Sequence, residues 1–283
     1  MPKTVVPGAA GKVGWWATGV LAEAGHDILA IDRVTPNASF PKGVKFWPAE
    51  LTDLGEVYQC LARADFVCHI AAIPSPTGFP EATTFKNNTQ STFNVFQAAV
   101  DSGVHKVAYT SSETVYGFIG GQRLTPQYLP VDEAYPTAPQ GAYALSKKLG
   151  EDMADMFCRN HDTAFASFRL ANVRCPGQYD VYTERRKNVV NQASGLWSYV
   201  DARDVGQACH RFWESGLTGH TVFNLSAEDN WLDVDLETVL DQTAFSGVER
   251  RGDFGGDATG WDISRARDLL GYRPEQSWRN NRE

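Results

Sequence analysis

Short apolar runs alternate with longer helical stretches over residues 1–170, and this alternation limits the possible folds more than any other feature. Each apolar run is four to eight residues long and rich in branched or aromatic side chains, which is typical of strands. The runs are TVVP, DILAID, VKFW, DFVCHIAA, KVAYTSS and AFASFRLA. Between them, helical periodicity marks GKVGWWATGVLAEAG, LTDLGEVYQCLAR, TFKNNTQSTFNVFQAAVDSG and AYALSKKLGEDMADMFCRN. Strand, helix and strand in succession require a parallel sheet with helices on both faces, so we predict a doubly wound α/β fold.

The alternation ends after Arg169. The segment CPGQYDVYTERRKNVVNQASG is polar and irregular, and LWSYV, a helical stretch from about residue 201 to 214, and HTVFNLS follow it. Two short helices and loops are expected in the remainder. We therefore divide the chain into a sheet domain, residues 1–168, and a small lobe, residues 169–283. We expect the lobe to cover the carboxyl edge of the sheet and partly to complete it.

Charge and composition exclude several classes of partner. A net charge of −8 and a pI of about 5.3 argue against nucleic acid or an anionic membrane as the main partner. The N-terminal MPKTVVPGAAG reaches glycine too early for a signal peptide, and no run of about 18 apolar residues occurs, so we expect a cytoplasmic protein. Neither the scattered cysteines nor the histidines have metal-ligand spacing, so we expect reduced thiols and no metal site.

A glycine-rich turn separates the first expected strand from the first expected helix. VVPGAAGKVG places Gly8, Gly11 and Gly14 at a spacing one residue away from Gly-x-Gly-x-x-Gly, with Lys12 and Val13 between them. Missing side chains allow a tight turn and a close approach of a pyrophosphate to the free N–H groups of a helix N-terminus. Such a spacing is also common in ordinary turns, so we infer a dinucleotide site only from the turn together with Asp32.

The second expected strand ends in a carboxylate. Asp32 follows Gly14 by 18 residues, where a carboxylate accepts hydrogen bonds from the adenosine ribose and repels a 2′-phosphate. Arg33 beside it is able to meet that phosphate instead. We favour NAD as the cofactor and keep NADP as the alternative.

The stretch GAYALSKKLGE places a phenol and an amine four residues apart. On a helix, Tyr143 and Lys147 lie on one face, one turn above the other. This spacing alone is also common in solvated helix faces.

Together these residues carry a resemblance over nearly the whole chain. The sequence resembles the extended short-chain dehydrogenase/reductase family, the NAD-dependent epimerase/dehydratase group, which implies a Rossmann-type sheet domain. TSSETVYG looks like the serine strand of that family, NNTQSTFNVFQAA like its asparagine helix and YALSKKLGE like its catalytic helix. RLANVRCPG, WSYVDARDV and DISRARDLLGYRP look like its later landmarks.

The resemblance implies four catalytic residues. Tyr143 is expected to be the general acid/base, with a pKa lowered by the Lys147 cation, which also holds the nicotinamide ribose. Ser112 is expected to hydrogen-bond the reacting oxygen, and Asn88 to complete the proton relay, although the neighbouring Asn87 complicates that assignment.

The resemblance implies further cofactor contacts. Glu50 and Leu51 are expected beside the adenine, and Ala71 and Ala72 in the wall beside the cofactor, where ordinary core alanines are the alternative. Pro7 stands where the family usually has threonine, which removes a hydroxyl and a backbone donor.

The residues after the catalytic serine bear on the reaction. Dehydratases resembling this chain have Thr-Asp-Glu where Ser112, Glu113 and Thr114 stand, and a threonine is too weak a base to replace the glutamate. We therefore do not expect dehydration. Glu113 either contacts substrate hydroxyls or faces outward from its strand.

The shortness of the lobe bears on the substrate. It is most similar in this respect to the uronate dehydrogenases, and it suggests a small sugar or sugar acid. Asn172 and Ser112 are candidate hydrogen-bonding partners, and Arg174 a candidate partner of a carboxylate or phosphate.

We thus expect an NAD(P)-dependent dehydrogenase that acts on a secondary alcohol or hemiacetal of a small carbohydrate-like molecule. A sugar epimerase with the same residues is one alternative, and a non-catalytic dinucleotide sensor is another. The resemblance also implies a homodimer that pairs the asparagine and catalytic helices.

Overall fold

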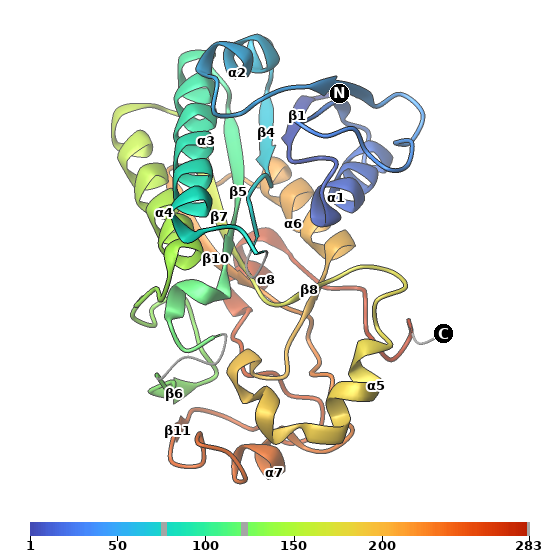
Figure 1. Ribbon diagram of the computed structural model, residues 1–283, viewed down its shortest axis with the longest axis vertical. Helices are drawn as coiled ribbons and strands as arrows, with labels where there is room; N and C mark the ends of the chain where they lie inside the picture. The colour runs from blue at the N-terminus through green and yellow to red at the C-terminus, as the bar shows by residue number, and fades with distance from the viewer. Residues whose placement is uncertain (75–77, 120–123, 282–283) are drawn as a thin grey trace.

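A parallel sheet forms the centre of the molecule (Figure 1). The computed structural model describes residues 1–74, 78–119 and 124–281. Within them, 7 strands hydrogen-bond in the order β10-β7-β5-β4-β1-β2-β3, and every pair is parallel. These strands are β1 (Lys3–Pro7), β2 (Asp27–Asp32), β3 (Lys45–Pro48), β4 (Phe66–His69), β5 (Lys106–Ser112), β7 (Ala164–Leu170) and β10 (His220–Leu225). This order is that of a Rossmann fold, so the predicted fold class is confirmed.

The strand order reverses between β1 and β4. β1 pairs with β2 on one side and with β4 on the other, so the connections leave this point in opposite directions. In open α/β sheets, a crevice forms at such a reversal, beyond the carboxyl ends of the strands. The topology therefore fixes where a ligand site is expected.

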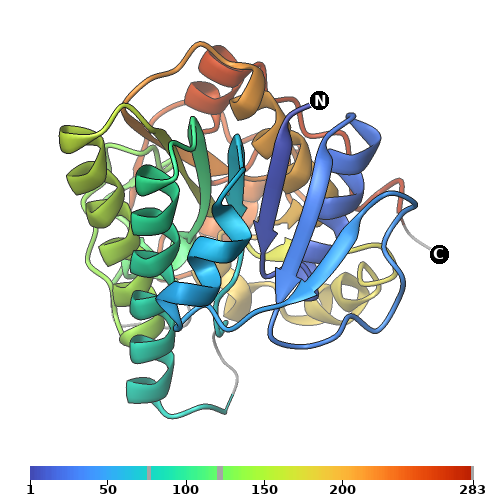
Figure 2. The same cartoon turned by 90° about the horizontal axis from the view of Figure 1, so that it is seen from above.

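Helices cover both faces of the sheet, as Figure 2 shows from above. On one face α1 (Lys12–Glu23) packs against α6 (Ala202–Glu214); on the other lie α2 (Leu54–Leu61), α3 (Glu81–Asp101) and α4 (Ala142–Asn160). Gly206 permits the contact of α1 with α6, because a Cβ there would lie 2.9 Å from Cα of Ala17.

The expected elements form with small differences at their ends. All six predicted strands are present, although β4 is shorter than DFVCHIAA, and the segment HTVFNLS supplies β10 at the edge of the main sheet. LWSYV is mostly irregular, since Leu196 and Trp197 have φ values of 50° and 52°. Only Val200 extends into a short strand, β9 (Val200–Asp201), which pairs with β8 (Val173–Arg174).

The lower part of Figure 1 is a lobe of short elements. Inside it, Tyr182 of α5 stacks on Trp231 with ring centres 5.2 Å apart, and both side chains are buried. The lobe also includes a segment from before residue 169, because β6 pairs with β11. Its elements, with the turn after β5, are η1 (Glu113–Tyr116), β6 (Tyr128–Leu129), α5 (Val181–Arg185), η2 (Arg186–Asn188), η3 (Val190–Gly195), α7 (Leu236–Leu240) and β11 (Glu249–Arg250). The last helix, α8 (Ser264–Leu270), packs instead against β10 and α6 of the sheet domain.

Candidate active site

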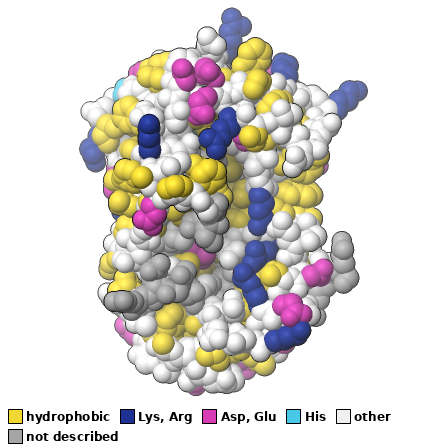
Figure 3. All heavy atoms as spheres, in the orientation of Figure 1, with side chains coloured by type: hydrophobic (Ala, Val, Ile, Leu, Met, Phe, Trp, Pro, Cys, Tyr) yellow, Lys and Arg dark blue, Asp and Glu magenta, His cyan; other side chains and the backbone are white. Residues whose placement is uncertain are grey.

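A cavity of about 560 Å³ lies at the carboxyl ends of the strands, between the sheet and the lobe. Figure 3 shows this face of the molecule hollowed at mid-height, with Lys and Arg side chains along the hollow. Most of the residues singled out from the sequence line this central cavity. They are Gly8, Gly11, Lys12, Val13, Gly14, Asp32, Arg33, Glu50, Leu51, Ala71, Ala72, Ser112, Glu113, Tyr143, Lys147 and Asn172.

The glycine turn is shaped so that no side chain would fit. Gly8 has a φ of +90°, and a Cβ there would lie 2.4 Å from the backbone nitrogen of Ala71. A Cβ on Gly14 would lie 2.0 Å from the carbonyl oxygen of Gly8. Within the part of the chain that the structure describes, no side chain caps the N-terminus of α1, whose first residue is Lys12, so its first N–H groups are available to an anion. These features fit the pyrophosphate of a dinucleotide.

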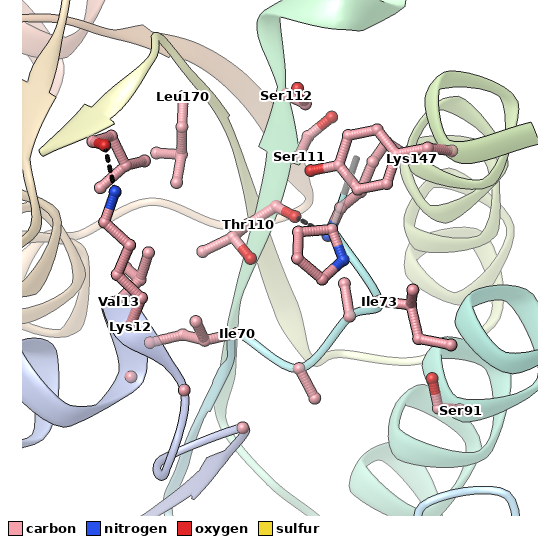
Figure 4. A pocket seen from close by; sticks show the side chains of 18 of the residues that line it. Lys12, Val13, Ile70, Ile73, Ser91, Thr110, Ser111, Ser112, Lys147 and Leu170 are labelled. Atoms are coloured by element: carbon pink, nitrogen blue, oxygen red, sulfur yellow. Dashed lines mark hydrogen bonds between the residues drawn. The ribbon is translucent and has the colours of Figure 1, made fainter. Parts of the chain in front are cut away.

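Lys12 closes one side of the turn. Its Nζ donates a 2.7 Å hydrogen bond to the carbonyl of Val173, which ties the start of α1 to β8 (Figure 4). Burial lowers the pKa of the amine. Lys12 thus connects the glycine turn to the segment that carries Asn172.

Asp32 already orders the backbone around it. Its two carboxylate oxygens accept hydrogen bonds from the N–H groups of Ala10, at 3.1 Å, and Val34, at 3.2 Å. Each oxygen retains a lone pair for a further donor. Arg33 beside it is exposed and lines the same cavity.

Helix α4 brings Tyr143 and Lys147 to the cavity, one turn apart. Nζ of Lys147 donates a 2.6 Å hydrogen bond to the carbonyl of Thr110 and lies 5.8 Å from the centre of the Tyr143 ring (Figure 4). Burial lowers the pKa of Lys147 to about 7 and raises that of Tyr143 to about 12. In the protein alone, desolvation therefore moves the phenol pKa in the direction opposite to the expected one.

Ser112 is held in place by Thr114, a residue that the sequence did not single out as a support. Oγ of Ser112 accepts hydrogen bonds from the hydroxyl of Thr114, at 3.0 Å, and from its N–H, at 3.2 Å. Ser112 also hydrogen-bonds Tyr143 and lowers the pKa of the phenol. Because the oxygen of Ser112 accepts both hydrogen bonds from Thr114, the proton of the serine hydroxyl is available for a hydrogen bond to Tyr143.

A buried ion pair anchors the catalytic helix to the sheet. Glu151 accepts from Arg169 at 2.8 Å and from the hydroxyl of Ser111 at 2.6 Å. Gly150 beside it lets α4 approach β5, because a Cβ there would lie 2.3 Å from the phenol oxygen of Tyr109. A glycine in the middle of a helical stretch was the available sequence signal for this close contact.

Asn88 and Arg174 are not among the cavity-lining residues. The side-chain amide of Asn88 bonds the N–H and carbonyl of Ile73, at 2.8 and 3.0 Å, and Oγ of Ser146 at 3.3 Å; Asn87 lines the cavity instead. Nε of Arg174 donates to the hydroxyl of Tyr182 at 3.1 Å, and its buried Nη2 has no partner among the described residues.

Glu113 faces the cavity rather than the outside of the sheet. Its side chain lines the cavity and is 6% exposed. Burial raises the pKa of its carboxyl to about 8, and Arg174 partly opposes that effect. Of the two alternatives for Glu113, the outward-facing one is therefore wrong.

Comparison with known proteins agrees with this geometry. The sequence model described as the NAD dependent epimerase/dehydratase family matches residues 4–226. The chain belongs to this family. NAD is the cofactor of the family, which agrees with the uncapped helix end and the glycine turn of this member.

Two curated relatives and one solved structure show the range of the similarity. An NAD-dependent glucose-6-phosphate dehydrogenase of Haloferax volcanii is 25% identical over 96% of this chain and 93% of its own. A UDP-glucose 4-epimerase of Drosophila melanogaster is 26% identical over 60% of this chain, which spans only 53% of the epimerase. The structure of a mutated uronate dehydrogenase has a TM-score of 0.72 and 21% identity over 99% of this chain and 84% of its own, which shows the shared fold.

Residues 1–74, 78–119 and 124–281 contain neither a membrane-spanning helix nor a metal-binding cluster. None of their helices combines the length and apolarity that a membrane span requires. The same residues hold no group of three or more His, Cys, Asp or Glu side chains arranged to bind a metal ion.

Proposed function

We propose that this protein is an NAD-dependent dehydrogenase that oxidises a secondary alcohol or hemiacetal of a small carbohydrate-like substrate. One observation carries the proposal: Ser112, Tyr143 and Lys147 line the same cavity as the glycine turn and Asp32. A proton-transfer group and a dinucleotide cradle in one cavity are what hydride transfer at a carbinol carbon requires.

We infer the cofactor contacts from the glycine turn, the start of α1 and the other residues that line the cavity. The N–H groups at the start of α1 bind the pyrophosphate, and Asp32 accepts from the adenosine ribose. Glu50 and Leu51 lie beside the adenine, Ala71 and Ala72 form the wall, and Lys147 binds the nicotinamide ribose. NAD, when bound, supplies the hydride acceptor and a positive charge beside the phenol.

Tyr143 is the base that removes the proton from the substrate oxygen. Ser112 donates to the phenol, which stabilises the phenolate that base catalysis needs. Because the pKa of Lys147 is about 7, its amine is only partly protonated at neutral pH. The protonated form stabilises the phenolate of Tyr143. Asn88 supports this path as a positioning residue, because it holds Ser146 next to Lys147.

The short lobe favours a sugar, a sugar acid or a sugar phosphate as the substrate. The Haloferax volcanii relative, similar over nearly the whole chain, is a glucose-6-phosphate dehydrogenase, which supports a sugar oxidised without a nucleotide. Asn172, which lines the cavity, contacts substrate hydroxyls. Arg174 does not line the cavity, so we assign it no direct substrate contact.

An epimerase that uses the same residues is the second candidate. The similarity to the Drosophila melanogaster UDP-glucose 4-epimerase supports it, although that similarity covers only 60% of this chain. An epimerase returns its hydride to the substrate, whereas a dehydrogenase releases NADH. Purified protein with NAD or NADP and a panel of aldoses, uronates and sugar phosphates decides between them by NADH absorbance and by product analysis.

We also propose a homodimer through α3 and α4. Phe93 of α3 and Leu145 of α4 are 37% and 40% exposed, and the two helices pack side by side. Large apolar side chains on adjacent helices favour a helical interface. Light scattering tests it: we expect a dimer for the native chain and monomers for a Phe93→Arg, Leu145→Arg double variant.

A further inference from the structure

Glu113 is a buried carboxyl group without a complete set of partners. It is the first residue of η1, directly after Ser112, and its side chain lines the central cavity at 6% exposure. Its Oε2 has no hydrogen-bond partner among the described residues. A buried polar atom left unpaired is costly, so its retention requires an explanation.

Two other glutamates with buried side chains show that the fold satisfies such groups elsewhere. Both oxygens of Glu151 accept from Arg169, and one also accepts from Ser111. The Glu133 side chain, 3% exposed, accepts from the N–H of Asn224 at 2.7 Å and lies 3.5 Å from Arg265. Of these three glutamates, only Glu113 both belongs to the residues that line the cavity and has a carboxylate oxygen without a partner among the described residues.

The surroundings of Glu113 indicate what it would bind. Its carboxyl lies close enough to Tyr143 to raise the pKa of the phenol, and close enough to Arg174 to have its own pKa lowered. The phenol and Ser112 hold the oxygen that is oxidised. The next oxygen along a sugar, on the neighbouring carbon, is therefore the one within reach of Glu113.

We propose that Glu113 determines specificity by hydrogen-bonding the hydroxyl on the carbon next to the one that is oxidised. The proposal rests on the dehydrogenase function and deepens it, because it restricts the substrate to sugars with a vicinal hydroxyl. A protonated carboxyl both donates to and accepts from that hydroxyl. An analogue without the hydroxyl leaves Glu113 unpaired in the complex, and sites built to bind a hydroxyl reject such analogues strongly.

The test compares matched sugars oxidised at C1. The pairs are D-glucose with 2-deoxy-D-glucose, D-galactose with 2-deoxy-D-galactose, and D-glucose 6-phosphate with its 2-deoxy analogue, each with NAD and with NADP. For any pair that the wild type oxidises, we expect kcat/KM for the hydroxylated sugar to exceed that for the deoxy sugar by at least ~10²-fold.

Variants then assign this preference to Glu113. We expect Glu113→Leu and Glu113→Ala to lose kcat/KM for the hydroxylated sugar but not for the deoxy sugar, so that the preference falls to about threefold or less. Glu113→Gln keeps a donor and an acceptor and should retain most of the preference. Glu133→Gln changes a buried glutamate away from the cavity and should leave the preference at the wild-type value.

The outcomes separate this inference from the proposed function. Oxidation of both members of a pair at similar rates by the wild type overturns the inference and leaves the dehydrogenase intact. An unchanged preference in both Glu113→Leu and Glu113→Ala overturns it as well. No oxidation of any of these sugars, with either cofactor, overturns the inference, and no oxidation of the wider panel of aldoses, uronates and sugar phosphates rejects the proposed function as well.

Discussion

The hydroxyl of Thr114 donates a 3.0 Å hydrogen bond to Oγ of Ser112, and its N–H donates to the same oxygen at 3.2 Å. The threonine thereby fixes the direction in which the serine proton points. Thr114→Val removes one of these donors and preserves side-chain shape. We expect kcat to fall roughly fivefold, as for the loss of a hydrogen bond worth about 1 kcal/mol, with little change in KM.

Thr114→Ser is the matched control, since it restores the hydroxyl, and it should recover most of kcat. Steady-state kinetics on the sugar that the wild type oxidises best measures both variants. Equal kcat values for Thr114→Val and the wild type would show that Ser112 is oriented by other contacts.

Two glycines of α1 give a matched pair for the cofactor cradle. Gly14→Ala places a Cβ 2.0 Å from the carbonyl oxygen of Gly8, whereas a Cβ on Gly19 meets nothing within 4 Å. We expect Gly14→Ala to weaken NAD binding about tenfold or more, since such crowding costs roughly 1–3 kcal/mol. Gly19→Ala should bind NAD normally and raise stability by up to about 1 kcal/mol. Calorimetry with NAD and thermal unfolding measure the two effects, and normal binding by Gly14→Ala would contradict the cradle.

Asp32 tests the choice of cofactor. Asp32→Asn removes the charge and keeps a single acceptor oxygen, so it serves only one of the two backbone donors, Ala10 and Val34. We expect kcat/KM for NAD to fall and the preference for NAD over NADP to decrease by about tenfold, because a charged acceptor binds the ribose more strongly and repels phosphate. A variant that loses NAD and NADP activity equally would show that Asp32 serves only the backbone turn.

The pKa of Glu113 predicts a pH dependence of stability. Burial raises it from 4.5 to about 8, so between these values the folded protein binds more protons than the unfolded chain. The free energy of unfolding therefore falls as pH rises from 4.5 to about 8, relative to a variant without this group. Denaturation of the wild type and Glu113→Gln at about pH 5 and about pH 9 should show the variant gaining stability at the higher pH, by an amount on the order of a few kcal/mol. A constant difference would mean that Glu113 titrates normally.

The fold could be predicted because apolar runs and helical periodicity are local patterns that repeat along the chain. Each buried parallel strand is a continuous apolar run, and the connection rules leave few ways to order such strands. The glycine turn and Asp32 were predictable for a similar reason, since backbone geometry restricts the residues there. The lobe was expected only to complete the sheet in part, and the segment HTVFNLS does so as the edge strand β10. LWSYV is irregular because Leu196 and Trp197 have positive φ values.

Details of the site depended on contacts that the sequence does not display. Strand alternation left the direction of Glu113 open, but the strand ends at Ser112, and a 3₁₀ turn brings both side chains to the cavity. The same turn places Thr114 against Ser112. The pKa of Tyr143 was expected to fall because a cation was counted nearby, whereas desolvation of the buried phenol dominates in the protein.

Asn88 shows a similar limit. Its place in the asparagine helix suggested a role in proton transfer, but its amide groups bond Ile73 and Ser146. The sequence shows that Asn88 is a polar residue on a helix. Which groups its side chain contacts depends on the position of Ile73, which follows β4.

The proposed dehydrogenase function requires that Tyr143 moves the proton and that NADH is released as a product. The direct measurement is NADH absorbance during incubation of NAD with the best sugar, for the wild type, Tyr143→Phe and the surface control Tyr58→Phe. We predict one NADH released for each sugar oxidised by the wild type and Tyr58→Phe, and a rate at least ~10²-fold lower for Tyr143→Phe with NAD affinity nearly unchanged. Wild-type turnover that yields an epimer without NADH, or a Tyr143→Phe variant with comparable turnover, would contradict it.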